Sequence, residues 1–469
     1  MQNYKQFFKG KKITVMGLGL LGRGIGYTKF LAECLSESQS EADGADLIVT
    51  DLKSSNALRP SLAKLRKYKN IKFVLGEHRL EDFRGRDMII KSAGVPLDSI
   101  YIKEAKKNGI PIEMDVSLFA KLAPKVMIVG VTGTRGKSIT TTLIYEILSK
   151  NIKDRKVYIG GNLRGVATLP LLKKVKEGDV LVCELDSWQL QGFARPTEQS
   201  FGRGESGFSP HISVFTSFMP DHMNYYKDSM EKYFEDKANI FRYQKKDDVL
   251  IIRPGMRKFI KKSDTKGKFI IVNPKDVSDW KFSVPGEHHR ENLACAVAAA
   301  QVLGVPMEVI KKSITQFKDL EGRMQLLKIY KGVKIYNDNN ATTPEATIAG
   351  IEAFSISARQ DLAEKKIVLI CGGADKGLPL DNFVKVINKN CKAVIFLKGS
   401  GTKKLLSSKQ KLVCRKVEAK DLKDAVKNSL GLARRGNVIL FSPAFASFGM
   451  FNNEYERNDL FIKIIKKLK

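Results

Sequence analysis

The chain has 469 residues, 43% of them hydrophobic and 28% charged, which is the balance of an ordinary globular protein. At roughly 100 to 200 residues per domain, this length predicts about three domains. The 81 Lys and Arg against 50 Asp and Glu give a net charge of +31, but the basic residues are spread along the whole chain. Nucleic-acid binding is therefore kept only as an alternative, and a basic surface that serves small anionic substrates is favoured.

No stretch approaches the roughly 18 uninterrupted apolar residues of a membrane helix, and no small-residue cleavage site follows the N-terminal segment. We therefore expect a cytoplasmic protein without a membrane span. The six cysteines show no C-x-x-C spacing, so neither a zinc site nor a disulfide framework is expected. They are interpreted as small, buried apolar residues.

The first part of the chain alternates strand-like apolar runs with helical spacing, which predicts parallel β-α-β units. Apolar runs occur at 12–19, 45–51, 72–76 and 87–94, and helical spacing at 27–35 and 99–109. After the first run, "GLGLLG" satisfies G-x-G-x-x-G, and Asp51 ends the next run as a ribose-binding acid would. The motif predicts a nucleotide-shaped ligand; tight packing of helix on strand is the alternative.

A boundary is expected near residues 121–125, where a second α/β segment begins, and a third begins near Glu321. The second segment contains apolar runs at 179–187, 211–217, 248–254 and 268–274 and ends in an Ala-rich helix at 291–304. The third again alternates strands and helices. The pattern predicts three consecutive α/β domains at 1–122, 123–320 and 321–469.

The stretch "GVTGTRGKS", residues 130–138, lies between a strand-like run and a segment with helical spacing. Glycines in such a loop leave backbone N–H groups free to surround phosphate oxygens, and the helix N-terminus adds about half a positive charge. Lys137 is expected to reach the β- and γ-phosphates of a nucleotide, and the Ser138 hydroxyl to ligate Mg²⁺. The loop departs from G-x-x-x-x-G-K-[ST] at Val131, and a glycine-rich turn without a ligand is the alternative.

Further stretches match, in order, those of a known family. They are "GGNLRG", "CELDSWQLQ", "PDHMNYY", "EDKANIF", "RENLACAVAAA", "EGRMQ", "YNDNNATTPEA", "GGADKG" and "SPAFASFGMF". With the two glycine motifs they make the chain resemble the Mur ligases over nearly its whole length, and within them the MurD type, the glutamate-adding branch. The resemblance implies a Rossmann-like UDP-binding domain, a central P-loop ATPase-type domain and a Rossmann-like C-terminal domain that binds the amino acid.

The resemblance also implies an ATP-dependent amide ligase of peptidoglycan precursor synthesis. ATP would convert the carboxylate of UDP-N-acetylmuramoyl-L-alanine to an acyl phosphate. The amino group of glutamate, with D-glutamate favoured, would then attack it and leave an amide, ADP and phosphate. Such chemistry depends on charge neutralisation and positioning. Two Mg²⁺ ions are implied as cofactors, and the enzyme is expected to be a monomer that binds no nucleic acid.

Residue roles are carried over from the family's motifs. The catalytic set is Lys137, His222 and Lys237, of which Lys237 matches a lysine that many members carbamylate. The ATP-binding set is Gly133, Thr134, Arg135, Gly136, Lys137, Ser138, Ile139, Asn292, Arg323 and Asp338. The UDP-substrate set is Leu18, Gly19, Asp51, Lys53, Asn162 and His222. The amino-acid set is Thr342, Lys376, Ser447 and Phe448, whose donors suit a dicarboxylic amino acid, and the metal set is Ser138, Glu184, carbamylated Lys237 and His222.

Residue type alone allows plainer roles. Lys237 reads as a surface lysine beside Asp236, Glu184 as a strand-end acid in an ion pair, and His222 as a loop or cap residue. Capping roles are the alternative for the asparagines, surface ion pairs for Arg323 and Asp338, and turn positions for the amino-acid set.

Three stretches depart from the MurD pattern. Asn340 replaces a lysine, "FNNEYERND" replaces F-K-N-Y-E-x-R-G, and residues 193–210 lengthen a loop. Despite these departures, ATP-dependent amide formation is still expected. An L-glutamate-adding variant and a folylpolyglutamate-type ligase are the alternatives within the superfamily. A basic nucleic-acid-binding ATPase and a nicotinamide-dependent dehydrogenase are the alternatives from other classes.

Overall fold

The computed structural model describes residues 4–35, 46–123, 125–194, 207–355 and 365–468. The chain divides into two compact units, of which the first comprises Met1–Asp276 and Asn292–Ser313 and the second Val277–Glu291 and Ile314–Lys469. Residues 36–45 and most of the long loop at 193–210 lie outside the described residues. Among the helices that are described, none is long and apolar enough to cross a membrane.

The first sheet of unit 1 is entirely parallel, with the strand order β3-β2-β1-β4-β5. Its strands are β1 (Ile13–Met16), β2 (Leu47–Asp51), β3 (Ile71–Leu75), β4 (Met88–Lys91) and β5 (Ile112–Glu113). The helices of this region are α1 (Tyr4–Phe8), α2 (Arg23–Leu35), α3 (Ser55–Ala63), α4 (Ile100–Lys107) and α5 (Asp115–Leu122). Strands that follow helices in this order confirm the predicted parallel β-α-β units.

The second sheet of unit 1 is also parallel, in the order β11-β10-β9-β6-β8-β7. Its strands are β6 (Met127–Thr132), β7 (Val157–Gly161), β8 (Val180–Glu184), β9 (Ile212–Phe215), β10 (Val249–Ile252) and β11 (Lys268–Ile271). The helices are α6 (Lys137–Asn151), α7 (Ser187–Leu190), α8 (Met223–Tyr226), α9 (Met230–Ala238), α10 (Glu287–Val302) and α11 (Met307–Thr315). The central strands β6, β8 and β9 bring their carboxyl ends to one edge, where ligands of open α/β sheets bind.

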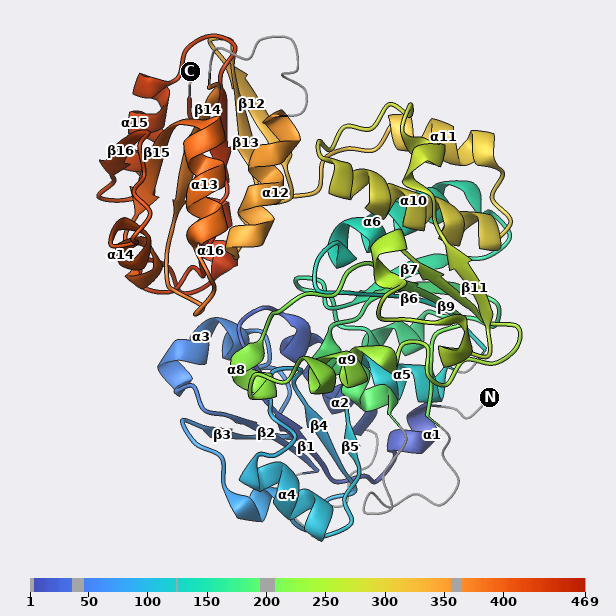
Figure 1. The fold of residues 1–469 in the computed structure, drawn as a ribbon. Coiled ribbons are helices and arrows are strands. Elements are labelled where there is room, and N and C mark those ends of the chain that lie inside the picture. The colour runs from blue at the N-terminus through green and yellow to red at the C-terminus, as the bar shows by residue number, and fades with distance from the viewer. Residues whose placement is uncertain (1–3, 36–45, 124, 195–206, 356–364, 469) are drawn as a thin grey trace. The chain divides into compact units, whose positions relative to one another are not determined.

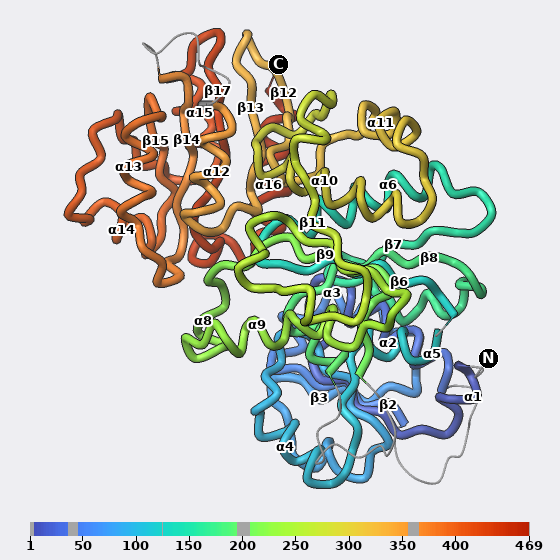
Figure 2. Tube along the Cα trace, turned by 45° about the vertical axis from the view of Figure 1, so that its right-hand side comes forward, coloured from blue at the N-terminus to red at the C-terminus, as the bar shows by residue number. Residues whose placement is uncertain are grey.

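One hydrophobic core joins the two sheets of unit 1. Phe30 of α2, Phe119 of α5 and Leu169 belong to the same buried cluster as side chains from β1 and β8. In both ribbon views α2 and α5 lie between the strands of the two sheets (Figures 1 and 2). Because each fully buried large apolar side chain contributes about 1.5–3 kcal/mol, this shared core fixes the first glycine motif relative to the second sheet.

Unit 2 contains a mixed sheet in the order β12-β13-β17-β14-β15-β16, in which β12 and β13 are antiparallel and the other neighbours parallel. Its strands are β12 (Gln325–Tyr330), β13 (Val333–Asn337), β14 (Ile367–Gly372), β15 (Cys391–Leu397), β16 (Arg415–Glu418) and β17 (Val438–Phe441). The helices are α12 (Pro344–Ser355), α13 (Asp381–Asn390), α14 (Ser400–Leu406), α15 (Leu422–Leu432) and α16 (Glu454–Lys466). Figure 1 shows α12 and α13 side by side in front of the strands, while Ala425 of α15 and Phe461 of α16 complete the sheet's core.

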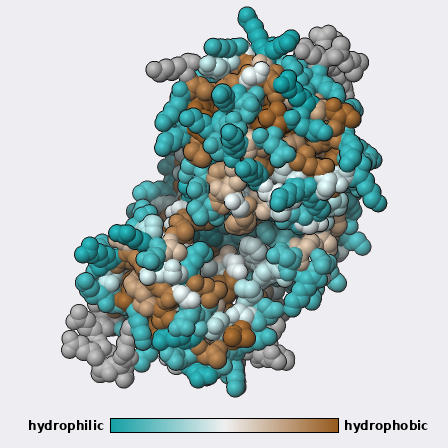
Figure 3. Space-filling view, turned by 90° about the vertical axis from the view of Figure 1, so that its left-hand side faces the viewer, coloured by the Kyte–Doolittle hydropathy of each residue, from teal (hydrophilic) through white to brown (hydrophobic). Residues whose placement is uncertain are grey.

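The structure confirms the predicted α/β class and adds the strands β5, β7, β12 and β16. The pattern did not predict β12, because its side chains are half-buried on both faces and show no clear alternation. All six cysteines are buried and free, as predicted. On the face drawn in Figure 3, hydrophobic residues lie in separate groups between hydrophilic ones, which is ordinary for a protein surface.

Candidate active site

The predicted phosphate loop connects β6 to α6 and requires glycine at two positions. Gly133 has φ 145° and Gly136 has φ 86°, a region that side chains of other residues disfavour. A Cβ at Gly133 would lie 2.1 Å from Thr216 Oγ1, and one at Gly136 would lie 2.3 Å from Asn292 Oδ1. The glycines therefore let the loop pack tightly against β9 and α10, which a turn between strand and helix alone does not require.

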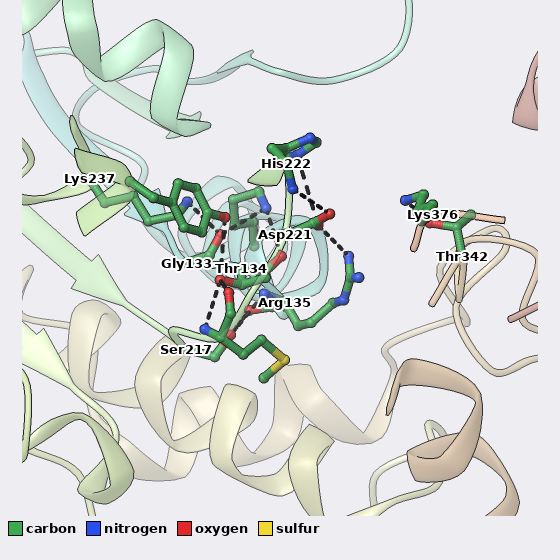
Figure 4. A network of polar contacts seen from close by, with 12 residues as sticks. Gly133, Thr134, Arg135, Ser217, Asp221, His222, Lys237, Thr342 and Lys376 are labelled. Carbon is green, nitrogen blue, oxygen red and sulfur yellow. Dashed lines mark hydrogen bonds and ion pairs between the residues drawn. The ribbon is translucent and has the colours of Figure 1, made fainter. Parts of the chain in front are cut away.

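The segment after β9 holds the loop in shape (Figure 4). The backbone N–H of Thr134 donates to the Ser217 carbonyl at 2.8 Å, and that of Arg135 donates to Ser217 Oγ at 2.8 Å. The Thr134 hydroxyl donates to the Met219 carbonyl at 3.1 Å. These bonds fix the loop before any ligand arrives, so little ordering entropy remains to be lost on binding.

Two lysines meet at one carbonyl of this loop. Lys137 Nζ lies 2.9 Å from the oxygen of Gly133, and Lys237 Nζ of α9 lies 3.0 Å from the same oxygen. Burial lowers the pKa of Lys137; burial and then the charge of Lys137 lower the pKa of Lys237 well below its usual value. Lys237 is 1% exposed, so its reading as a surface lysine is wrong.

Carboxylates surround these lysines. Glu184 ends β8 and is 4% exposed; its Oε1 lies 3.5 Å from Asn162 Nδ2, and its Oε2 is buried without a hydrogen-bond partner among the described residues. Asp221 pairs with Arg135 at 3.2 Å. Asp186, which the sequence reasoning did not single out, partly offsets the lowering of the pKa of both lysines through its charge, and it caps α7.

A metal fits this site in part. The unpartnered Oε2 of Glu184 is a hard oxygen donor of the kind Mg²⁺ prefers, and it lies at the end of β8, where Glu184 pairs with Val131 of β6. Within the described ranges, no group of three or more His, Cys, Asp or Glu side chains is arranged to hold a metal.

His222 lies at the N-cap position of α8 in the left-handed region, with φ 57°. Its ring packs against Trp188 at a tilt of 49° with centroids 4.6 Å apart, and its Nε2 lies 3.8 Å from Asp221 Oδ2. Its side chain makes no capping bond to the helix, so the cap role is not what fixes it. Backbone strain of this kind is often kept at functional sites.

The first glycine motif closes around Asp51. Backbone N–H groups of Leu18 and Gly19 each donate to Asp51 Oδ2 at 2.9 Å, and that of Lys53 donates to Oδ1 at 2.9 Å. The structure thus brings together four of the predicted UDP-binding residues. The Asp51 carboxylate therefore holds the glycine loop in a fixed shape.

In unit 2, the predicted amino-acid residues Lys376 and Thr342 lie together, with Lys376 Nζ 3.2 Å from Thr342 Oγ1 (Figure 4). The stretches that contain Lys376 and Ser447 are joined by reciprocal backbone bonds between Ala374 and Ala446 at 2.9 and 3.1 Å. Ser447 is 5% exposed, whereas Phe448 is 61% exposed.

Three residues predicted to bind ATP, namely Asp338, Arg323 and Ile139, are buried or half-buried. Asp338 is buried and accepts a hydrogen bond from the Ser442 hydroxyl at 2.8 Å, so a surface ion pair is excluded for it. Arg323 is half-buried beside Met324, and Ile139 is buried in the first turns of α6.

A buried arginine that the sequence reasoning missed organises this part of unit 2. Arg457 of α16 is 1% exposed, and its guanidinium donates to Asn339 Oδ1 at 2.8 Å, the Asn339 carbonyl at 3.0 Å and the Phe445 carbonyl at 3.3 Å. Burial lowers its pKa to about 10. It clamps the stretch of Asn340 to that of Ser447, which are far apart in sequence.

Comparisons with known proteins decide the family. The Mur ligase middle domain matches residues 131–260, and the Mur ligase glutamate ligase domain matches residues 322–445. A UDP-N-acetylmuramoylalanine–D-glutamate ligase of Roseiflexus sp. (strain RS-1) is 34% identical, covering 97% of this chain and 98% of its own. The chain belongs to the Mur ligase family. The ligases of the same name from Borreliella afzelii and Clostridioides difficile are 33% and 31% identical, covering 98% of this chain and 98% and 99% of their own.

Solved structures show the same fold. The UDP-N-acetylmuramate-alanine ligase MurC of Thermotoga maritima superposes with a TM-score of 0.58 at 18% identity, covering 98% of this chain and all of its own. MurF of the same organism, solved with ADP, has a TM-score of 0.54 at 18% identity and covers 83% and 97%. The expected Mur ligase fold is therefore confirmed.

Proposed function

We propose that this Mur ligase adds D-glutamate to UDP-N-acetylmuramoyl-L-alanine in the cytoplasm, using ATP. Full-length similarity to relatives of that name supports the substrate pair. The observation in the structure that carries the proposal is the meeting of Lys137, Lys237 and the unpartnered Glu184 oxygen at the phosphate loop. The positive charge of Lys137 at this loop favours the arrival of an anion such as a nucleotide phosphate.

The proposed chemistry follows from these groups. A carboxylate oxygen of the acceptor attacks the γ-phosphorus, and the bond to the β–γ bridging oxygen breaks to release ADP. Lys137 neutralises the charge on the transferred phosphoryl oxygens. The amino group of glutamate then attacks the acyl carbon, loses a proton and displaces phosphate. Mg²⁺, held by Ser138 and Glu184 with His222 and a modified Lys237, would neutralise phosphate charge.

Lys237 is proposed to be carbamylated. Burial and the charge of Lys137 lower its pKa, which favours the neutral amine, and the neutral nitrogen can form a bond to the carbon of CO₂ with release of one proton. The product carries one negative charge and so removes the repulsion from Lys137. It would also supply a carboxylate for a second ion.

The remaining assignments complete the proposal. We propose domains at 1–122, 123–320 and 321–469, with the ATP, UDP-acceptor and amino-acid residues as expected from the resemblance; the presence of three sheets supports this division. Donation by Lys376 and the Thr342 hydroxyl suits a dicarboxylic amino acid, since each carboxylate needs donors. The enzyme is proposed to act as a monomer.

The deciding experiment measures ADP formation with purified protein, UDP-N-acetylmuramoyl-L-alanine and either glutamate enantiomer. We expect turnover with D-glutamate, dependent on the acceptor, and a product heavier by one glutamyl residue. Turnover with L-glutamate alone would make the protein the L-glutamate variant. ATP hydrolysis that needs no acceptor and is stimulated by nucleic acid would overturn the proposal.

A further inference from the structure

The loop after β7, residues 162–169, is held by the N-terminal segment of unit 1. The Leu21 carbonyl accepts the N–H of Gly165 at 3.0 Å, and a Cβ at Gly22 would lie 3.1 Å from Gly165 Cα. At the far end, Asp115 accepts the N–H groups of Thr168 and Leu169 at 2.8 and 2.7 Å. The glycine motif that was predicted to bind a nucleotide therefore also docks this loop.

Arg23, the first residue of α2, reaches from the glycine motif to Asn162 on this loop. Its Nη2 donates to Asn162 Oδ1 at 2.5 Å, and the residues are 139 positions apart. A guanidinium has donors and no acceptor, so the amide atom that faces it must be the oxygen. The amide nitrogen of Asn162 consequently faces Glu184, with Nδ2 3.5 Å from Oε1.

This orientation has a chemical consequence at Glu184. The carboxylate receives an N–H donor rather than an amide oxygen, whose lone pairs would repel it. The backbone N–H of Asn162 also donates to the Glu184 carbonyl at 2.7 Å. Arg23, Asn162 and Glu184 thus form one chain of donors and acceptors from the glycine motif to the strand end beside the phosphate loop.

We propose that Arg23 is a positioning residue for the ligase reaction, which fixes the amide of Asn162 so that its N–H₂ stays on the Glu184 side of the site, where the acceptor is proposed to bind. The inference rests on the proposed function. It assigns a role to a residue of the glycine motif that lies outside the predicted UDP-binding set. Without Arg23 the amide can rotate, and the acceptor loses a preorganised donor.

A double-mutant cycle tests the role. We expect Arg23→Met to lower kcat/KM for the UDP-linked acceptor about ten- to a hundredfold, the rate equivalent of one charge-assisted hydrogen bond. Arg23→Lys, which keeps a donor, should recover part of the loss. Because Arg23 acts through Asn162, Arg23→Met should cost almost nothing further in an Asn162→Ala background. Arg66→Met, at an exposed position after α3, is the control and should match wild type.

Acceptor binding without ATP or Mg²⁺ gives a readout that does not need turnover. Calorimetry with UDP-N-acetylmuramoyl-L-alanine should show weaker binding to Arg23→Met than to wild type and Arg66→Met. Additive losses in the cycle, or equal acceptor affinity in Arg23→Met and wild type, would overturn the positioning role. A wild type that binds the acceptor but adds no glutamate would count against the proposed function, while the binding comparison still decides the role of Arg23.

Discussion

Replacing Gly26 with alanine tests whether α2 and the loop after β7 are packed as closely as the structure indicates. Gly26 lies in α2, and a Cβ there would stand 2.5 Å from the Cβ of Ala167. Carbon atoms in contact lie about 3.5–4.0 Å apart, so the loop or the helix must move by about 1 Å. A flexible side chain could give way cheaply, but the Ala167 methyl has no rotamer to change.

Two effects of opposite sign compete in Gly26→Ala. Alanine within a helix is favoured over glycine by about 1 kcal/mol, whereas overpacking typically costs about 1–3 kcal/mol. Because the overlap is with a methyl fixed to the backbone, we expect the upper part of that cost and a net loss of about 1–2 kcal/mol. The matched control is Gly431→Ala in α15, where nothing lies within 4 Å of the added Cβ, so the propensity gain should appear alone.

Scanning calorimetry distinguishes the two variants. For a domain of this size, a loss of 1 kcal/mol lowers the Tm by about 2–4 °C. Gly26→Ala should therefore lower the Tm of unit 1 by several degrees, whereas Gly431→Ala should leave the Tm of unit 2 unchanged or raise it. Gly26→Ala should also lower the rate with the UDP-linked acceptor, since the moved loop carries Asn162. Stability at or above wild type for Gly26→Ala would refute the close packing.

Four further substitutions, at three positions, test the charged groups. Lys137→Ala should abolish ADP formation in the glutamate assay, because no other donor replaces its charge at the loop; near-normal turnover would mean that the loop is not the phosphate cradle. Lys237→Ala should be inactive and partly rescued by added short carboxylates, and full activity without them would exclude the carbamate. In CO₂-free buffer, the free energy of unfolding of the wild type should rise with pH between the lowered pKa of Lys237 in the folded state and its pKa near 10.4 in the unfolded state. In this pH range Lys237 is protonated only in the unfolded chain, so raising the pH destabilises the unfolded state. The slope is at most about 1.4 kcal/mol per pH unit for this group, and Lys237→Met should show a smaller slope in urea titrations; an unchanged slope would mean that Lys237 is charged in the fold. Arg457→Met should destabilise unit 2 by about 3 kcal/mol, since it leaves two carbonyls and an amide oxygen without their donor, and should raise KM for glutamate more than KM for ATP; equal changes in both would argue against a local role.

The features predicted well from sequence are those encoded within a few neighbouring residues. The phosphate loop is one, because a strand, two glycines, a lysine and a helix follow one another along ten or so positions. The parallel strands are another, since buried strands are apolar throughout their length. Local patterns of this kind need no knowledge of what packs against them.

Contacts between distant segments could not be predicted in this way. Arg457 contacts Asn339, 118 positions away in the sequence, and Arg23 contacts Asn162, 139 positions away. The sequence around one residue of such a pair does not indicate which residue it contacts. The burial of Lys237 did leave a signal in the sequence. It follows Tyr233 by four residues on α9 and precedes Ala238, which is the spacing of a buried helical face.

The charges around the phosphate loop favour one order for carbamylation, metal binding and nucleotide binding at the proposed site. Lys137 and Lys237 share the Gly133 carbonyl, and the charge of Lys137 disfavours a second ammonium beside it. Carboxylates stabilise the charge on both lysines: Glu184, Asp186 and Asp221 at Lys137, and Asp186, Asp221 and Asp236 at Lys237. Burial and the charge of Lys137 nevertheless lower the pKa of Lys237 well below its usual value, which favours the neutral amine that reacts with CO₂. Once the carbamate has formed, it attracts Lys137 where the ammonium repelled it, and the loop then needs added cations to accept the phosphates of ATP. We infer that carbamylation precedes metal and nucleotide binding, because each of those steps is favoured by the charge that the previous one leaves.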